Sequence, residues 1–307
     1  MNILITGGAG FIGYHLCKKK LEEGNKVICI DNLNSGQLDN INHLIKYQHF
    51  SFINHNIIKP LIIEQDIDEI YHLACPASPK YYQLDDKFTL DTCYKGTQNI
   101  LELALKKNSK VLFTSTSEIY GDPLEHPQTE EYKGNVNTFG SRSCYDEGKR
   151  VAETLMYIYK NYGVNIRIVR IFNTYGPNMR LNDGRVITNF ISQALENKSI
   201  TIYGDGNQTR CFCYIDDMIE GICKLMNSDY TKPINLGNPE EITMNELAII
   251  VKNLTKSHSD IVYTNLPEDD PKRRKPHIYK AKHILNWKPK TNLTQGLIHT
   301  IYHYMKH

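Results

Sequence analysis

The sequence predicts an α/β fold, a doubly wound parallel sheet with a smaller C-terminal α/β lobe. Through the first 172 residues, short apolar segments alternate with longer segments that carry apolar residues at helical spacing. Such alternation is typical of a parallel sheet covered by helices on both faces. After residue 172 the alternation becomes irregular. We therefore predict a sheet domain over residues 1–172 and a lobe over residues 173–307 that is partly interleaved with it.

A glycine-rich turn joins the first predicted strand, residues 2–6, to the first predicted helix, residues 14–23. It places Gly7, Gly10 and Gly13 at Gly-x-x-Gly-x-x-Gly spacing. Glycines let the backbone approach a pyrophosphate, and the start of the helix offers unpaired N–H groups and a positive dipole end. Strand, turn and helix in this order form the context of a Rossmann-type dinucleotide-binding loop.

The second predicted strand, residues 26–30, is followed by Asp31. An acid about 20 residues beyond such a loop accepts hydrogen bonds from the adenosine ribose hydroxyls. Its carboxylate would repel a 2′-phosphate, and no arginine occurs in residues 32–35. The alternative, a surface turn after a strand, is much less favoured because of the loop upstream. Asp31 therefore indicates NAD rather than NADP.

The remaining elements follow from periodicity and turn residues. In the first domain we expect strands at residues 50–54, 69–73, 110–113 and 165–170, and helices at 88–107 and 143–159. In the lobe we expect helices at residues 183–197, 216–226, 242–254 and 293–305, and strands at 200–203, 210–214 and 233–236. Residues 74–79 form a proline-containing loop at the carboxyl end of a strand, which is where ligands bind in open α/β sheets.

Tyr145 and Lys149 lie four residues apart on a predicted helix and therefore on one face of it. Tyrosine has a pKa of about 10, and a nearby ammonium group favours the phenolate, so the pair could accept a proton near neutral pH. The spacing alone is equally consistent with a solvated helix face. The dinucleotide loop and the hydroxyl-rich strand end at residues 114–118 favour catalysis.

The bulk composition excludes several classes of protein. The formal net charge is +2 and the pI is about 8.0, so general nucleic-acid binding is not expected. No apolar run approaches the length of a membrane span, and no signal peptide is visible. The eight cysteines are scattered, and Cys211-x-Cys213 has no second Cys/His pair at finger spacing. We expect a cytoplasmic protein with reduced thiols and no metal.

Taken together, these motifs resemble the extended short-chain dehydrogenase/reductase superfamily, and most of all its UDP-glucuronate decarboxylase (UDP-xylose synthase) family. The resemblance covers nearly the whole chain, from the glycine loop to residues 287–289. The segments that carry it are residues 72–79, 114–127, 142–150, 171–177, 203–206 and 274–276.

The resemblance implies a redox-neutral reaction in which NAD stays bound. Tyr145 would remove the proton of the sugar 4-hydroxyl while hydride passes from C4 to the nicotinamide. Lys149 would stabilise the phenolate, and Thr116 would take the hydroxyl position beside the 4-oxygen. The resulting β-keto acid loses carbon dioxide, and protonation at C5 with return of the hydride gives UDP-xylose.

Two positions distinguish families within this superfamily. The related 4,6-dehydratases place an Asp-Glu pair where this chain has Ser117-Glu118, and the missing acid removes a proton donor for dehydration. Glu118 would then orient the sugar ring or a water. The arginine matching Arg274 is tied to the substrate carboxylate and to C5 protonation, and Arg273 is a neighbouring competitor. A guanidinium suits a carboxylate by bidentate geometry.

The resemblance also assigns binding residues. For NAD they are Gly7, Gly10, Phe11, Ile12, Gly13, Asp31, Asn32, Asn56, Ile57, Leu73, Ala74, Tyr145 and Lys149. For the UDP-sugar they are Pro79, Tyr82, Asn173, Arg185, Tyr203, Arg210, Tyr214 and Arg274. The chain departs from the family at Asn56, where an Asp near the adenine is usual, and at Cys93, where an Asn is usual.

The family pairs the helices at 88–107 and 143–159 across a two-fold axis, so the resemblance implies a homodimer with a four-helix interface. Two alternatives to decarboxylation remain at this stage. One is a nucleotide-sugar 4-epimerase or 4,6-dehydratase of the same superfamily, and the other is a non-catalytic NAD-binding protein.

Overall fold

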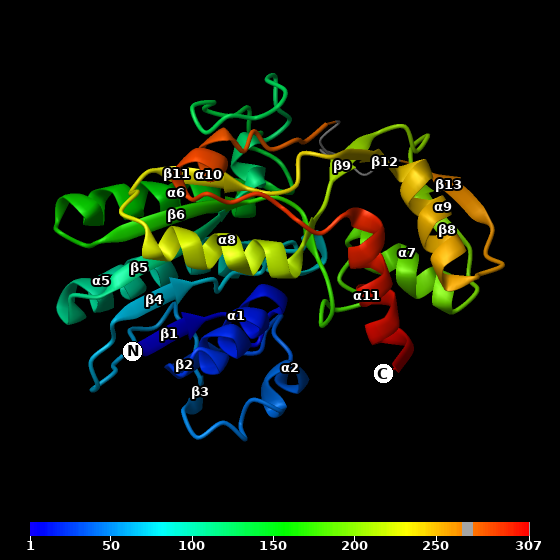
Figure 1. Ribbon diagram of the computed structural model, residues 1–307. Helices are drawn as coiled ribbons and strands as arrows, with labels where there is room; N and C mark the ends of the chain where they lie inside the picture. The colour runs from blue at the N-terminus through cyan, green and yellow to red at the C-terminus, as the bar shows by residue number, and fades with distance from the viewer. Residues whose placement is uncertain (266–272, 307) are drawn as a thin grey trace.

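Within the described part of the chain, the central element is a seven-stranded sheet in which all neighbouring strands are parallel (Figure 1). The computed structural model describes residues 1–265 and 273–306. In spatial order the strands are β11 (Pro233–Leu236), β6 (Ile166–Ile171), β5 (Lys110–Thr116), β4 (Glu69–His72), β1 (Asn2–Thr6), β2 (Lys26–Asp31) and β3 (Phe50–Asn54). The predicted doubly wound parallel sheet is confirmed.

The strand order reverses between β1 and β4, which are hydrogen-bonded neighbours. From β1 the chain proceeds through β2 to β3 at one edge, and from β4 it proceeds through β5 and β6 toward the other. Connections on opposite faces leave a crevice at the carboxyl ends of the strands where the order reverses. The turn after β1 and the loop after β4 therefore face the same crevice.

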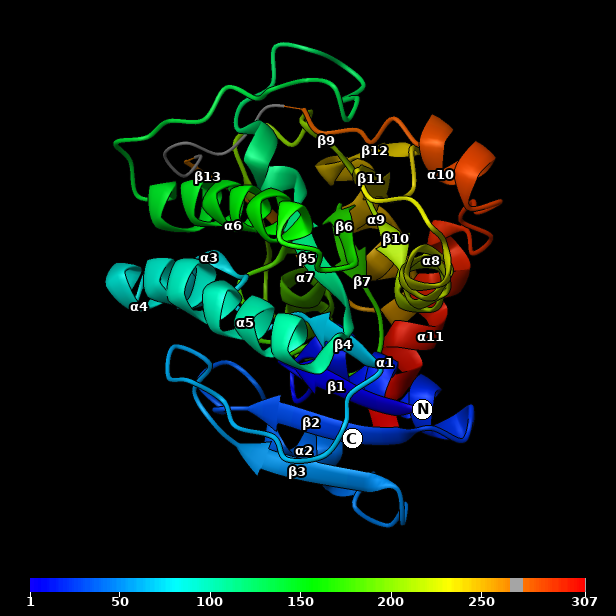
Figure 2. The same cartoon turned by 90° about the vertical axis from the view of Figure 1, so that its left-hand side faces the viewer.

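Two layers of helices cover the sheet (Figure 2). One layer contains α1 (Phe11–Glu22) and α8 (Ile215–Asn227), which pack against each other. The other contains α5 (Thr97–Lys107) and α6 (Ser143–Asn161). Both layers bury apolar side chains on the sheet, so neither face of the central strands reaches solvent.

The β1 strand shows why the sheet is buried on both sides. Ile3 and Ile5 belong to the buried cluster that includes residues of α1 and α8, whereas Leu4 belongs to the cluster beneath α5 and α6. All three side chains are fully buried. A strand with two buried faces is apolar at every position, which explains the Ile-Leu-Ile sequence.

The rest of the chain forms a lobe of short sheets and helices, at the right of Figure 1. Its elements are β7 (Thr174–Tyr175), α7 (Val186–Leu195), β8 (Ile200–Tyr203), β9 (Thr209–Cys211), β10 (Cys213–Tyr214), β12 (Glu241–Thr243), α9 (Met244–Thr255), β13 (Ile261–Thr264) and α11 (Leu293–Lys306). Because α8 and β11 return to the main sheet and α10 (Tyr279–Ile284) packs on β11, the two parts interleave (Figure 1); the division at residue 172 stays a prediction.

Most expected elements differ from the observed ones by one to three residues at an end, and three of them contain or adjoin a turn or break in the chain. The helix expected at 88–107 begins earlier as α4 (Asp86–Asp91) and passes through a π-helical turn, η1 (Thr92–Gly96), before α5. The helix expected from residue 183 begins at Val186, because the Asp183 carboxylate accepts the Arg185 N–H at 3.0 Å and holds the chain in a turn. The strand expected at 210–214 is interrupted at Phe212.

The structure also contains short elements that were not expected: α2 (Leu38–Asn42), α3 (Pro79–Tyr82), the 3-10 turn η2 (Ser117–Tyr120), β7, β12, β13 and α10. Each has six residues or fewer, too few for a periodic pattern to show.

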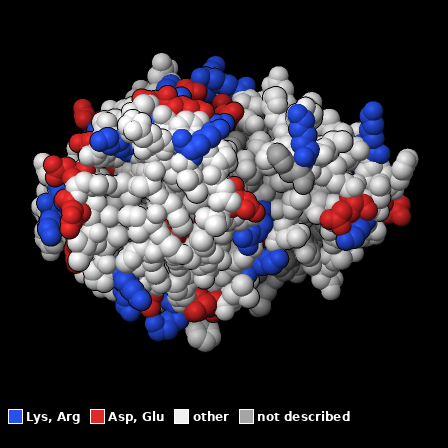
Figure 3. Space-filling view, turned by 90° about the horizontal axis from the view of Figure 1, so that it is seen from below, with Lys and Arg blue, Asp and Glu red and all other residues white. Residues whose placement is uncertain are grey.

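On the face seen in Figure 3, acidic and basic side chains are mixed around a broad uncharged area. Among the described helices, none combines the length and apolar character needed to cross a membrane.

Candidate active site

A cavity of about 650 Å³ lies at the carboxyl ends of the central strands, between the sheet and the lobe. Its volume is in the range of small-molecule sites. All but one of the predicted site residues line it, namely Gly7, Gly10, Phe11, Ile12, Gly13, Asp31, Asn32, Asn56, Ile57, Leu73, Ala74, Pro79, Tyr82, Thr116, Ser117, Glu118, Tyr145, Lys149, Asn173, Arg185, Tyr203, Arg210 and Arg274.

The glycine turn after β1 is shaped to receive an anionic group. Gly7 has a φ of +72°, which favours glycine, and a Cβ at Gly13 would lie 2.1 Å from the Gly7 carbonyl oxygen. Gly10, the residue before α1, gives the helix no side-chain cap. The N–H groups of the first helical turn are therefore available to a ligand. These features fit the pyrophosphate of a dinucleotide.

Asp31 ends β2 beside this turn. Its carboxylate accepts the backbone N–H of Leu33 at 2.8 Å and that of Ala9 at 3.1 Å. Burial raises the pKa of Asp31, although these hydrogen bonds oppose the rise. A carboxylate oxygen can accept more than one hydrogen bond, so Asp31 can still receive ribose hydroxyls. No Arg or Lys occurs in the segment 32–37 that follows it, which fits NAD better than NADP.

Tyr145 and Lys149 come from the first turns of α6, which packs against β5. The Tyr145 hydroxyl is hydrogen-bonded to Thr116 at the end of β5. Lys149 Nζ donates to the Thr114 carbonyl at 2.8 Å and lies 5.9 Å from the centre of the Tyr145 ring. The three residues predicted to form the proton-transfer set thus meet in one wall of the cavity.

The pKa of Tyr145 is shifted in the direction opposite to the one predicted from Lys149. The pKa of Tyr145 is raised well above its ordinary value, mainly by burial and by the negative charge of an ionised Cys75 nearby, while the hydrogen bond from Thr116 opposes the rise. The Lys149 ammonium is engaged by a backbone carbonyl rather than by the phenol. Burial therefore favours the neutral phenol of Tyr145.

Glu118 is held between two arginines. Arg142 Nη2 donates to one carboxylate oxygen at 2.6 Å, and Arg274 Nη1 donates to the other. Arg274 also donates to the Gly121 carbonyl at 3.0 Å. Burial opposes ionisation of Glu118, but the two guanidinium groups outweigh it and lower its pKa to about 2. The adjacent Asp146 is different, since burial and the Glu118 charge raise its pKa to about 7.

Tyr82 forms a further part of the wall near Tyr145. The two rings stack with centres 4.9 Å apart and planes 4° from parallel. The Tyr82 side chain is buried, and its hydroxyl has no hydrogen-bond partner among the described residues. A buried polar group without a partner is rare in folded proteins, so this hydroxyl is available to a ligand.

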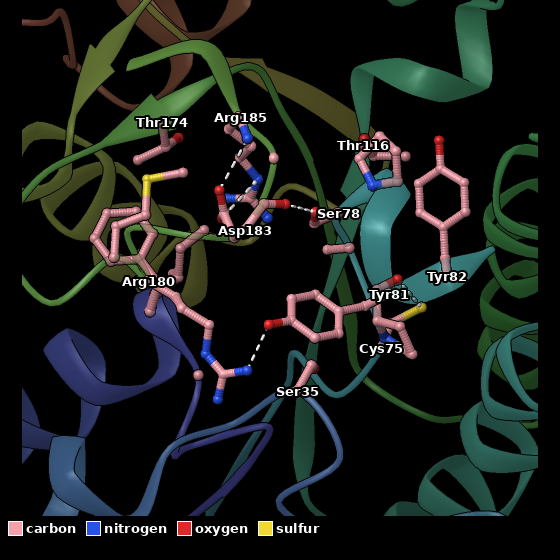
Figure 4. A pocket seen from close by; sticks show the side chains of 18 of the residues that line it. Ser35, Cys75, Ser78, Tyr81, Tyr82, Thr116, Thr174, Arg180, Asp183 and Arg185 are labelled. Atoms are coloured by element: carbon pink, nitrogen blue, oxygen red, sulfur yellow. Dashed lines mark hydrogen bonds and ion pairs between the residues drawn. The ribbon is translucent and has the colours of Figure 1, made fainter. Parts of the chain in front are cut away.

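The lobe supplies the opposite wall (Figure 4). Arg185 Nε lies 3.4 Å from the Asp183 carboxylate, and Arg210 donates to the Thr209 carbonyl at 2.9 Å. Arg180 reaches across the cavity to the Tyr81 hydroxyl. These three arginines give this wall the positive charge that a diphosphate requires.

Tyr214 does not line the cavity. Its side chain is buried in the core, with its ring 5.7 Å from that of Tyr175 and 6.1 Å from that of His299. The interruption at Phe212 separates β9 from β10, so the alternation that starts at Arg210 does not continue to residue 214. The prediction that Tyr214 binds substrate is therefore corrected to a packing role.

Arg142 and Arg180 line the cavity but were not among the predicted site residues. Arg142 had a local signal, because it stands three residues before Tyr145 and thus on the same helical face. Arg180 had no such signal in the sequence, because it follows an irregular stretch and its contact with Tyr81 spans 99 residues.

Among the described residues, no group of three or more His, Cys, Asp or Glu side chains could hold a metal ion.

Comparison with known proteins agrees with this geometry. Residues 3–237 match the model of the NAD dependent epimerase/dehydratase family. The chain is 54% identical to UDP-glucuronic acid decarboxylase 6 of Arabidopsis thaliana over 299 residues, 97% of this chain and 87% of that protein. It is 50% identical to UDP-glucuronic acid decarboxylase 1 of Xenopus tropicalis over 305 residues, 99% of this chain and 72% of that protein.

Among solved structures, UDP-glucuronic acid 4-epimerase of Bacillus cereus, in complex with UDP-glucuronic acid and NAD, superposes with a TM-score of 0.88. The two chains are 29% identical, and the match covers 100% of this chain and 99% of the epimerase. The chain therefore belongs to the NAD-dependent epimerase/dehydratase family and, within it, to the UDP-glucuronic acid decarboxylases.

Proposed function

We propose that this protein converts UDP-glucuronate to UDP-xylose and carbon dioxide, with NAD regenerated in each cycle. The identity to the decarboxylases supports the reaction, and the observation that supports a uronate as its substrate is the cluster of Arg142, Arg274 and Glu118 beside Tyr145. Two guanidinium groups face one firmly ionised carboxylate, while Asp146 has a pKa of about 7 and is partly neutral. The cluster has an excess of positive charge that the carboxylate of a uronic acid would neutralise.

NAD would be held by the glycine turn and Asp31, and when bound it accepts the hydride from the sugar and returns it. The residues of the chain then have separate tasks. Thr116 would hold the sugar 4-hydroxyl against Tyr145, whose oxygen receives the proton once the bound cofactor has favoured ionisation of the phenol. Lys149 would stabilise that phenolate before the proton is transferred. Arg274 would bind the carboxylate of the 4-keto acid and hold it in the orientation from which carbon dioxide departs.

UDP would occupy the wall formed by the lobe. Arg185 and Arg210 would bind the diphosphate as forked donors, and Arg180 would join them after releasing the Tyr81 hydroxyl. Asn173 and Tyr203 would contact the remainder of the nucleotide. Tyr82 has a buried hydroxyl without a partner among the described residues, which supports a contact with the sugar.

A 4-epimerase of the same substrate is the second candidate, favoured by the likeness to the Bacillus cereus enzyme. Binding of a uronate carboxylate by Arg274 fits both reactions, so it does not decide between them. Ser117 argues against a dehydratase, because it places a hydroxyl where those enzymes have an acid. The level of identity to the decarboxylases favours decarboxylation.

The test is to incubate the purified protein with UDP-glucuronate and to measure released carbon dioxide and the mass of the UDP-sugar. Decarboxylation releases gas and lowers the mass of the product. Epimerisation leaves the mass unchanged, and a non-catalytic NAD-binding protein changes neither. The Tyr145→Phe variant serves as the control, since it retains the cavity but lacks the hydroxyl.

We further propose a homodimer formed through α4, α5 and α6, which lie side by side in Figure 2. These helices and η1 expose large apolar side chains, namely Leu90, Tyr94, Leu105, Val151, Tyr157 and Ile158. Exposed apolar groups gathered on neighbouring helices are typical of interaction surfaces.

We also propose that the protein resides in a reducing compartment such as the cytoplasm. All eight cysteines are free, which supports this proposal.

A further inference from the structure

Two thiols from separate elements meet at the edge of the cavity. Cys75 lies in the loop after β4, and Cys93 lies in the π-helical turn η1. Their Sγ atoms are 3.4 Å apart. Cys75 is partly exposed and lines the cavity, whereas Cys93 is only 2% exposed. One member of the pair can therefore be reached by a small solute, and the other is behind it.

The surroundings of the two thiols differ in a way that assigns them different roles. Burial opposes ionisation of Cys75, but the hydrogen bond from Cys93 and the charge of Lys149 lower its pKa. That hydrogen bond and burial raise the pKa of Cys93. Cys75 is thus the thiol that ionises first, and the thiolate is the reactive form of cysteine. Cys93 keeps its proton and faces Cys75.

We propose that Cys75 and Cys93 form an oxidisable dithiol that a peroxide converts to a disulfide. The Cys75 thiolate attacks one oxygen of hydrogen peroxide, the O–O bond breaks, and hydroxide leaves, which gives a sulfenic acid at Cys75. The Cys93 sulfur then attacks the Cys75 sulfur, the S–OH bond breaks, and the Cys93 proton leaves with the hydroxyl group as water. Two electrons pass from the thiols to the peroxide.

Oxidation would act on the site through the loop at residues 74–79. A disulfide needs its sulfurs about 2.05 Å apart, so the two segments must approach each other beyond the observed contact. Cys75 would move toward η1 and away from the cavity, together with its neighbour Ala74. Because the charge of Lys149 lowers the pKa of both thiols, formation of the disulfide would also remove a negative charge that interacts with Lys149. We expect the oxidised protein to have lower turnover, recoverable by reduction.

A second thiol pair in the same chain serves as an internal control. Cys17 and Cys29 lie together beneath Gly8 and are both 0% exposed. The Cys17 thiol donates to the Gly8 carbonyl at 4.0 Å, and burial raises the pKa of Cys17. Neither lines the cavity. If proximity alone decided reactivity, both pairs would be oxidised; if access and ionisation decide it, only Cys75 and Cys93 react.

The experiment treats the full-length protein with hydrogen peroxide, alkylates the remaining thiols and maps the peptides by mass spectrometry. We expect a Cys75–Cys93 cross-linked peptide that has lost two hydrogen atoms and that disappears after treatment with dithiothreitol, while Cys17 and Cys29 are alkylated. The cross-link should be lost in Cys93→Ser and in Cys75→Ser. It should persist in Cys144→Ser, which removes another partly exposed thiol.

The proposal is overturned if Cys75 is oxidised without a cross-link to Cys93, if both thiols remain alkylatable, or if the buried pair is oxidised at the same rate. Circular dichroism of each variant checks that it is folded, and the two single variants test the pair from both sides. The readout is the mass of a peptide, so it does not depend on the proposed decarboxylase activity.

Discussion

Replacing Glu118 by glutamine should remove a defined part of the pH dependence of stability. Glu118 has a pKa of about 2 in the folded chain against an ordinary value of 4.5. That difference corresponds to roughly 3 kcal/mol of unfolding free energy at neutral pH. Because the pKa is lowered by folding, this contribution is complete well above pH 4.5 and is lost as the pH falls toward 2. Roughly 2 kcal/mol should be lost by pH 3.

The assay is urea unfolding between pH 7 and pH 3, followed by the fluorescence of Trp287. It is the only tryptophan of the chain and is buried, with its Nε1 donating to the Asp217 carbonyl at 2.8 Å. At pH 7 the Glu118→Gln variant should be about 3–5 kcal/mol less stable than the parent, because two buried guanidinium groups lose their counter-ion. Between pH 7 and pH 3 the variant should lose roughly 2 kcal/mol less than the parent.

The matched control is Glu147→Gln, on the helix α6 that begins directly after Arg142. Glu147 forms an ion pair with Arg150 at 3.4 Å, and its side chain is 33% exposed. Loss of this half-exposed pair should cost less than about 1 kcal/mol. The substitution leaves Glu118 and both of its arginines in place, so the loss of roughly 2 kcal/mol between pH 7 and pH 3 should persist. If Glu118→Gln and the parent lose stability in parallel down to pH 3, the Arg142–Glu118–Arg274 cluster does not hold the charge we assign to it.

Three further predictions concern turnover and assembly. Tyr145→Phe should lower turnover by roughly 10²–10⁴-fold with NAD still bound, as judged by product formation and by cofactor titration; full activity would remove Tyr145 from the mechanism. Arg274→Ala should spare oxidation at C4 more than loss of carbon dioxide, so that keto acid and reduced cofactor accumulate in single turnovers; their absence would contradict this division of roles. Tyr157→Glu, at a position 63% exposed on α6, should shift the protein toward monomer in light scattering, while Tyr302→Glu, 58% exposed on α11, should not.

The main sheet and the glycine turn were predictable because their signals are local. Ile3 to Ile5 give an apolar strand, and the spacing of Gly7, Gly10 and Gly13 gives the turn, without any information from elsewhere in the chain. Each depends only on backbone conformation and on burial of one short segment. The structure confirms both elements at the expected residues.

Contacts between distant segments were not predictable from the residues. Glu118 and Arg274 are 156 positions apart, and only the fold shows that Arg142 reaches the same carboxylate. The Tyr214 side chain points into the core rather than the cavity because the strand is interrupted at Phe212, and the periodicity of the sequence does not reveal that interruption. Family resemblance supplied the role of Arg274, but the charge state of the cluster needed distances and burial.

Tyr145 gives the sharpest disagreement between the sequence and the structure. Helical spacing placed an ammonium group near the phenol and suggested an ionised base. In the structure the Lys149 ammonium lies 4.8 Å from the centre of the Phe113 ring and donates to the Thr114 carbonyl, while burial and the Cys75 thiol raise the pKa of Tyr145. The spacing was correct, and the balance between burial and charge was not visible from it.

This disagreement leads to a spectroscopic prediction for the protein freed of NAD. Because the pKa of Tyr145 is raised above its ordinary value of 10.0, its hydroxyl should remain protonated throughout the neutral range. The difference in tyrosinate ultraviolet absorbance between the parent and Tyr145→Phe should therefore be absent from pH 6 to pH 10. A difference that titrates near pH 7 would mean that Lys149 already stabilises the phenolate. If no absorbance difference appears, Tyr145 ionises only when the bound cofactor brings positive charge into the cavity, and proton transfer then depends on that cofactor.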